Sequence, residues 1–231
     1  MKSIFSEAFL RHAEYHAAWG TEQLDALGRA LPAGGEWTAD LEQQVYRAAG
    51  RTVRVGLLGT FDVTGRSWLW AWANPSLRGT PVVVASERVA EFGKRNRIPE
   101  LREAGVDLSG FDDPRWAAEA LAFVAMGVLS APGYIGQSAG SDTRVYFTPD
   151  DPQIQLAPLD PIAMPRFLMT GQTLFSRSAR QVVRGYFAHH GIRAEKTIDG
   201  TRAHLPDGST VQVTFDPLGR IANISAGART S

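Results

Sequence analysis

The 231 residues are enough for one large hydrophobic core, or for one domain with a small appendage. The 24 basic and 24 acidic residues cancel, so charge does not favour nucleic acid or an anionic membrane as a partner. The chain has no cysteine, which excludes disulfides and thiol catalysis, and no stretch approaches the ~20 apolar residues of a membrane span. Composition therefore predicts a globular cytoplasmic protein.

The first predicted element is a helix over residues 3–31, either continuous or broken at Gly20. Pro32 and the glycines after it end this segment. Three or four antiparallel strands are expected over residues 37–73.

The most informative stretch is the run Trp68-Leu69-Trp70-Ala71-Trp72-Ala73-Asn74-Pro75, which holds half of the six tryptophans. Their spacing of two places all three indoles on one face of a strand. A preceding strand over 52–62 pairs with it across the turn 63–66, with Phe61 opposite Trp68, Gly59 opposite Trp70 and Leu57 opposite Trp72. Gly59 leaves room for an indole. This stripe forms either the core, which we favour, or the floor of a ligand cavity.

Two helices are predicted next. The first starts near Ser86, which is expected to cap it. The second has the start signal Asp112-Asp113-Pro114 and runs to about Leu129. This second helix is apolar nearly all round and is expected to be buried, with its one acid, Glu119, paired to Arg115.

A hairpin is expected to join residues 134–136 to 144–147. Five prolines then fall between Pro149 and Pro165 and predict an extended connection. We place a boundary there, between a main domain over 1–160 and a C-terminal module over 161–231.

The C-terminal module is predicted to be a helix followed by a four-stranded meander, docked on the main domain. Ser178 caps the helix and Gly191 ends it. In the meander, the turn at Pro206-Asp207-Gly208 sets Ala203 against Val211 and Thr201 against Val213. The fold class is thus α+β, an antiparallel sheet flanked by helices and followed by this module.

Histidines and arginines are the candidate chemical groups. His12 and His16 lie four apart on one helix face, and His189-His190 falls in the last turn of another helix. Both pairs are more simply explained as structural than as metal ligands or catalysts. Arg177, Arg180 and Arg184 form a basic stripe that is expected to be solvated. No phosphate loop, dinucleotide fingerprint or serine-hydrolase elbow is present, and we expect no metal or other cofactor.

These patterns predict a non-catalytic cytoplasmic protein that binds a protein partner or a small molecule. The alternative is an enzyme or small-ligand carrier with a cavity lined by the tryptophan face. The tentative ligand-binding residues are Trp68, Trp70, Trp72, Asn74, Tyr134 and Tyr146. Asn74 has an ordinary explanation too, which is to close the turn before Pro75 with its side chain.

The Trp68–Pro75 run, preceded by Leu58-Gly59-Thr60-Phe61-Asp62, resembles the signature of a widespread bacterial family of uncharacterised proteins. Members tend to end in a Phe-Asp-Xaa-Xaa-Gly-Arg segment, here Phe215 to Arg220. The resemblance implies a shared fold and brings no activity or catalytic residue with it.

Overall fold

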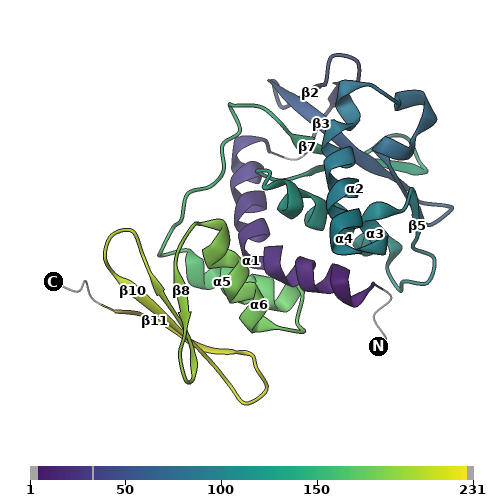
Figure 1. Cartoon of the computed structure of the whole chain (residues 1–231). Helices are drawn as coiled ribbons and strands as arrows, with labels where there is room; N and C mark the ends of the chain where they lie inside the picture. The colour runs from purple at the N-terminus through teal and green to yellow at the C-terminus, as the bar shows by residue number, and fades with distance from the viewer. Residues whose placement is uncertain (1–4, 33, 228–231) are drawn as a thin grey trace. The chain divides into compact units, whose positions relative to one another are not determined.

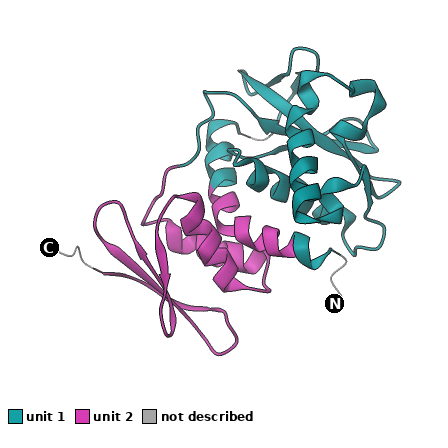
Figure 2. Ribbon diagram, in the orientation of Figure 1, with its two compact units in different colours: residues 1–9, 23–157 teal, residues 10–22, 158–231 magenta. Residues whose placement is uncertain are grey.

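A computed structural model describes residues 5–32 and 34–227 (Figure 1). Contacts divide the chain into two compact units. Unit 1 comprises residues 1–9 and 23–157, and unit 2 comprises residues 10–22 and 158–231 (Figure 2). The predicted boundary at 160 stays a prediction, and the sequence did not suggest that residues 10–22 pack with the C-terminal part.

The N-terminal helix α1 is continuous over Glu7–Ala30 and passes through Gly20 without a break. Ser6 caps it, because its Oγ accepts a hydrogen bond from the N–H of Phe9 at 3.1 Å. The same Oγ donates to the carboxylate of Glu100 at 2.8 Å. This carboxylate therefore holds the start of α1 within unit 1.

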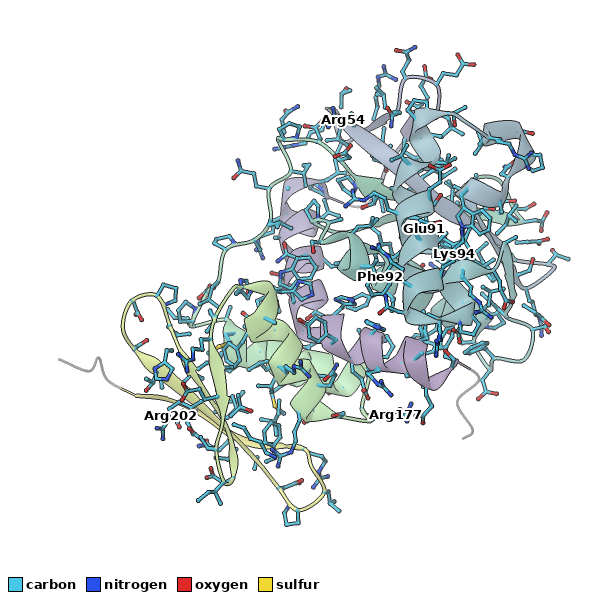
Figure 3. The ribbon with its side chains drawn as sticks, viewed as in Figure 1. Arg54, Glu91, Phe92, Lys94, Arg177 and Arg202 are labelled. Atoms are coloured by element: carbon cyan, nitrogen blue, oxygen red, sulfur yellow. The ribbon has the colours of Figure 1, made fainter. Side chains whose placement is uncertain are left out.

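Unit 1 contains a seven-stranded antiparallel sheet. Its strands are β1 (Trp37–Asp40), β2 (Val45–Ala48), β3 (Arg51–Asp62), β4 (Ser67–Trp70), β5 (Gly105–Asp107), β6 (Ile135–Ser138) and β7 (Thr143–Pro149). The long strand β3 pairs with β2, β4 and β7 and is the centre of the sheet. At its start, Arg54 holds the chain that follows β7: its backbone N–H donates to Asp151 Oδ2 at 2.8 Å, and its Nε donates to the carbonyl of Asp150 at 2.5 Å (Figure 3).

The predicted register of the tryptophan hairpin is confirmed at Phe61 opposite Trp68 and Gly59 opposite Trp70. Gly59 is required there, because a Cβ would lie 2.7 Å from Cζ2 of the Trp68 ring. The prediction for Trp72 was wrong. The strand ends at Trp70 and the chain turns into the 3-10 helix η1 (Ala71–Ala73), where the N–H of Trp72 donates to Ser86 Oγ at 2.9 Å instead of to a strand.

Helices α2 (Val84–Asn96) and α4 (Pro114–Leu129) contact β3, and the short α3 (Pro99–Arg102) packs against both helices. Two further 3-10 helices, η2 (Pro75–Leu77) and η3 (Pro81–Val83), precede α2. The predicted cap at Ser86 was wrong. Ser86 is buried inside α2, and its hydroxyl donates to the carbonyl of Val83. Because the same oxygen accepts from the N–H of Trp72, it links α2 to η1. The predicted cap of α4 is confirmed, with Asp113 Oδ1 accepting from the N–H of Trp116 at 3.0 Å.

Unit 2 combines the middle of α1 with two helices and a second sheet. Helix α6 (Ala179–His189) begins at its predicted cap, Ser178, and its buried residues include Ala179, Val182, Val183, Tyr186 and Phe187. Helix α5 (Met164–Leu174) was not predicted, because the prolines before it suggested extended chain; Pro165 instead occupies the first turn, where a missing N–H costs nothing. The strands β8 (Ala194–Lys196), β9 (Gly200–His204), β10 (Thr210–Phe215) and β11 (Ile221–Gly227) form the four-stranded meander in the predicted register.

Two glycines allow the helices of unit 2 to approach closely. A Cβ on Gly185 of α6 would overlap the backbone carbonyl of Tyr15 in α1. A Cβ on Gly171 of α5 would lie 2.6 Å from the backbone nitrogen of Ala18. Backbone contacts this short leave no room for a side chain.

The fold class is α+β, as the sequence predicted, with helices on two antiparallel sheets. Among residues 5–32 and 34–227, no helix is both long and apolar enough to cross a bilayer.

Replacement of Trp70 by alanine should destabilise unit 1 by about 3–5 kcal/mol, because its indole is fully buried and its Nε1 donates to the carbonyl of Glu100 at 2.9 Å. Leu69→Ala is the matched control. Leu69 is the next residue of β4 but is 38% exposed, so its loss should cost less than about 1 kcal/mol. Urea unfolding of both variants gives the comparison, and equal losses would contradict the assignment of Trp70 to the core.

Gly185→Ala should destabilise unit 2 by about 2 kcal/mol or more, since the added methyl must push α6 away from α1. Gly28→Ala is its control, because Gly28 lies in α1 with nothing within 4 Å of the added Cβ. That change should stabilise the helix by about 0.5–1 kcal/mol. If Gly185→Ala melted like Gly28→Ala, the close packing described above would be wrong.

Candidate ligand-binding site

The tentative ligand-binding residues do not form one site. Trp68 and Trp70 lie in the core, 1% and 0% exposed, with ring centroids 5.1 Å apart. Trp72 is partly buried in η1. Asn74 takes its ordinary role: its side chain accepts from the N–H of Ser76 at 3.0 Å and closes the turn. Only Tyr134 and Tyr146 lie beside a polar cluster, and a role in ligand binding stays a prediction for all six.

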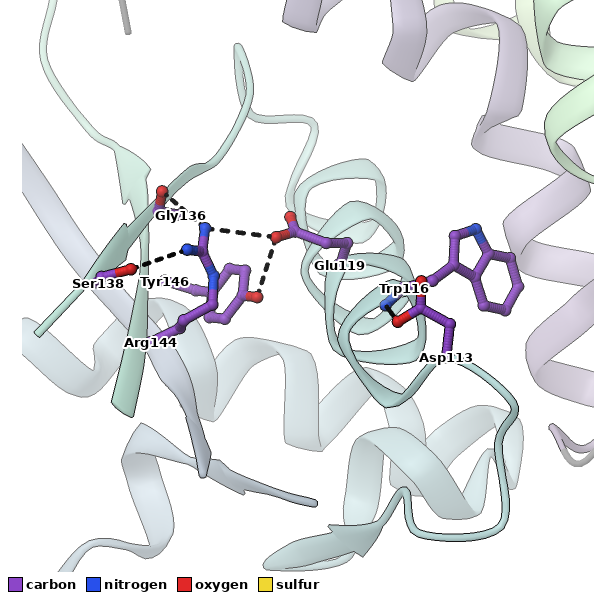
Figure 4. Close-up of polar contacts among 7 residues, drawn as sticks. All are labelled: Asp113, Trp116, Glu119, Gly136, Ser138, Arg144 and Tyr146. Carbon is purple, nitrogen blue, oxygen red and sulfur yellow. Dashed lines mark hydrogen bonds and ion pairs between the residues drawn. The ribbon is translucent and has the colours of Figure 1, made fainter. Parts of the chain in front are cut away.

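That cluster is centred on Glu119 of α4 (Figure 4). Its Oε1 accepts a hydrogen bond from the hydroxyl of Tyr146 in β7 at 3.0 Å and lies 3.6 Å from Nη2 of Arg144 in the same strand. Tyr134 lies close enough to this carboxylate for its charge to raise the pKa of the phenol. Glu119 was predicted to pair with Arg115, and that prediction was wrong. Its side chain is engaged by β7, which presents a phenol and a guanidinium together.

Both tyrosines are hydrogen-bond donors at neutral pH. Burial raises the pKa of Tyr134 and of Tyr146 far above the ordinary phenol value, and the neighbouring Glu119 carboxylate raises them further. Neither is therefore available as a phenolate. Oε1 of Glu119 in turn is engaged by both Tyr146 and Arg144, so the cluster is suited to holding β7 and α4 together.

Arg144 is held by the cluster as a fixed cation. Its Nη1 donates to Ser138 Oγ at 3.1 Å and its Nη2 donates to the carbonyl of Gly136 at 3.2 Å (Figure 4). Its side chain is only 14% exposed, and its buried Nε has no hydrogen-bond partner among the described residues. Bonds to strand β6 and an ion pair with helix α4 hold the guanidinium in one orientation.

A cleft of about 390 Å³ lies beside Arg144. Its walls come from the β3–β4 turn, the β6–β7 hairpin and the start of α4. The lining has apolar residues (Phe61, Val63 and Pro114), hydroxyls (Ser138, Ser141 and Thr143), arginines (Arg66, Arg115 and Arg144) and aspartates (Asp112 and Asp113). An apolar floor with several convergent polar groups is typical of a small-molecule site.

Unit 2 brings together histidines that the sequence analysis treated as separate pairs. His16 Nδ1 lies 2.8 Å from His189 Nε2, and the ring of Trp19 stacks on His189 at 4.1 Å and 7°. Burial lowers the pKa of His189 to about 4 and lowers that of His16 well below its ordinary value. Each pKa is lowered further by a neighbouring histidine. Both imidazoles are therefore neutral at pH 7.

The neighbouring His190 has a different partner. Its Nε2 lies 2.6 Å from Glu22 Oε2, and Glu22 Oε1 accepts from the hydroxyl of Tyr186 at 2.8 Å. This buried carboxylate thus has donors on both oxygens. No three histidine, aspartate or glutamate side chains converge as a metal site in the part of the chain that the structure describes.

The sequence analysis missed Glu22, Arg66 and Arg144 as possible functional residues. Glu119 did carry a signal, because it is the one acid inside a helix that is otherwise apolar. A carboxylate in that position has to find donors from another element, but the sequence does not identify the element.

Comparison with known proteins yields one finding. The sequence model of a family described as "Family of unknown function (DUF6882)" matches residues 4–152. This range includes the whole sheet of unit 1, Glu119, Arg144 and the cleft, and stops before α5. No curated protein matches, and no solved structure matches.

Acid should destabilise unit 2 through His16 and His189. The unfolded chain binds a proton on each histidine near pH 6.5, whereas folded His189 does so only near pH 4, so the unfolded state binds more protons in this interval. The free energy of unfolding should therefore fall as pH drops from about 6.5 to about 4, by about 2 kcal/mol for His189.

Urea unfolding as a function of pH measures this slope. His189→Asn removes the titrating ring and should flatten the slope between pH 6.5 and 4.5. His204→Asn is the control, because its side chain is half exposed on the second sheet, and that variant should keep the slope of the unmodified protein. Identical slopes in all three proteins would contradict the prediction.

Proposed function

The chain belongs to the family of unknown function DUF6882, and we propose that it is a non-catalytic binding protein whose cleft in unit 1 takes a small molecule. The observation that carries this proposal is the coupling between the cleft and the Glu119 cluster. Arg144 lines the cleft and is fixed by Glu119, Ser138 and Gly136. A wall that is already rigid loses little entropy when a ligand binds.

Binding is better supported than catalysis. The three hydroxyl residues of the cleft have no histidine among its lining residues to accept their protons. The two tyrosines behind the cleft are kept as phenols, and the Glu119 carboxylate is occupied. One hydroxyl of the cleft contacts a carboxylate, because Ser141 Oγ donates to Oδ2 of the adjacent, exposed Asp142 at 2.6 Å. No imidazole lines the cleft, so it offers positioned donors and no hydroxyl paired with a histidine base.

The tryptophans do not supply the binding site of this proposal. A solid core beneath the stripe was expected to favour an interaction protein, and a cavity lined by indoles to favour an enzyme or small-ligand carrier. Trp68 and Trp70 are fully buried and absent from the lining of the cleft. Trp68 packs beside Phe61, which lines the cleft, because the two are partners in neighbouring strands.

We also infer the setting of the protein. The resemblance of Trp68–Pro75 to a bacterial signature supports a bacterial source and makes this run the mark of the family. A chain without cysteine is compatible with the reducing cytoplasm.

Two-dimensional NMR with a library of small fragments tests the proposal. Fragments that bind should shift the backbone signals of the cleft residues, and Ser141→Trp should abolish those shifts by filling the cleft. Ala139→Trp is the matched control, because Ala139 is also exposed in the same hairpin but does not line the cleft. The proposal fails if no fragment shifts the cleft signals, or if both tryptophan variants lose binding equally.

A further inference from the structure

Arg66 occupies a backbone position that favours glycine. It ends the β3–β4 turn with a φ of 48°, in the left-handed region. Its carbonyl accepts from the N–H of Leu108 at 2.8 Å, which holds the backbone in place. Glycine would adopt this conformation without strain, so the local backbone gives no reason for an arginine.

Arg115 is also at a place where its charge is locally unfavourable. It is in the first turn of α4, where the exposed N–H groups make the helix end positive and where acidic residues are preferred. The carboxylate that could have compensated it one turn later, Glu119, is engaged by Arg144 and Tyr146. Among the described residues, no carboxylate forms an ion pair with Arg66 or Arg115.

Both arginines line the same cleft. Two residues whose side chains are locally unfavourable and that line one cleft indicate a binding site. Natural sequences keep locally unfavourable residues where function requires them. We propose that the ligand of this cleft carries an anionic group, a carboxylate or a phosphate, bound by the guanidinium groups of Arg66 and Arg115. This inference rests on the proposed function, since it names the ligand class of the same cleft.

The other charged residues of the cleft limit the ligand further. Arg144 already donates to Ser138 and Gly136, so it forms part of the wall of the cleft. The contacts with the ligand then come from Arg66 and Arg115. Asp113 caps α4 with its Oδ1, and Asp112 also lines the cleft and repels anions. Because Arg144 is paired with Glu119, Arg66 and Arg115 stand against Asp112 and Asp113, and the cleft has no large positive excess. A ligand with one anionic group fits this balance, and an extended polyanion does not.

Titration of the full-length chain with inorganic phosphate, acetate and the neutral probe glycerol, followed by two-dimensional NMR, tests the inference. Phosphate or acetate should shift the signals of the cleft residues and glycerol should not; the tighter of the two anions identifies the group. Arg66→Gly and Arg115→Ala should each weaken anion binding at least tenfold. Neither variant should have a lower melting temperature. Glycine adopts the left-handed backbone of the turn without strain, and removal of a positive charge from the start of a helix is favourable.

Arg97→Gly is the matched control for Arg66→Gly. Arg97 also has a left-handed backbone, with a φ of 56°, but it ends α2 and does not line the cleft. The Arg97→Gly variant should also keep its melting temperature, and its affinity for the anion should be unchanged. The inference is overturned if neither anion shifts the cleft signals, or if Arg66→Gly and Arg97→Gly bind alike. Neutral fragments that still bind in the cleft would then leave the proposed function standing.

Discussion

The architecture of the candidate site depends on one carboxylate on a helix that is otherwise apolar. Glu119 sits in α4 between residues that are packed in the core, so its charge has to be compensated by another element. Tyr146 and Arg144 reach it from β7, and Tyr134 from the chain before β6. This requirement joins the β6–β7 hairpin to α4. The cleft beside Arg144 follows from the same contacts.

Unit 2 buries titratable groups in two other ways. His16 and His189 face each other and remain neutral, because burial lowers both pKa values and neighbouring histidines lower them further. Glu22 instead receives donors on both oxygens, from Tyr186 and His190. Adjacent histidines at the end of α6 therefore have unlike environments. The first pair is sensitive to acid, because its imidazoles are buried without a carboxylate partner at the contact.

Patterns that act over a few residues were sufficient to predict much of the fold. Asp113 and Pro114 start a helix by capping and by a preset φ, Phe61 pairs with Trp68 across a short turn, and the turn at Pro206 sets the register of the second sheet. Two of the errors fell where a distant residue competes for a backbone group. Trp72 leaves the strand because its N–H finds Ser86, and Ser86 is consequently no cap.

The sequence by itself determined the α+β class, the buried helix, the pairing of Phe61 with Trp68 and the register of the second sheet, because hydrophobic period, capping and turn chemistry are local properties. It left open whether the tryptophans form core or a cavity floor, and burial of Trp68 and Trp70 is a tertiary result. The tertiary structure alone decided which groups meet. Glu119 lies beside Arg144 of β7 and not beside Arg115 one turn away in its own helix. His16 contacts His189, which is 173 positions away in the sequence. The physical reason is that compensation of a buried charge depends on distance in space. An ion pair with an i, i+4 neighbour at an exposed helix start stabilises a carboxylate less than contacts with a phenol and a guanidinium inside the protein do.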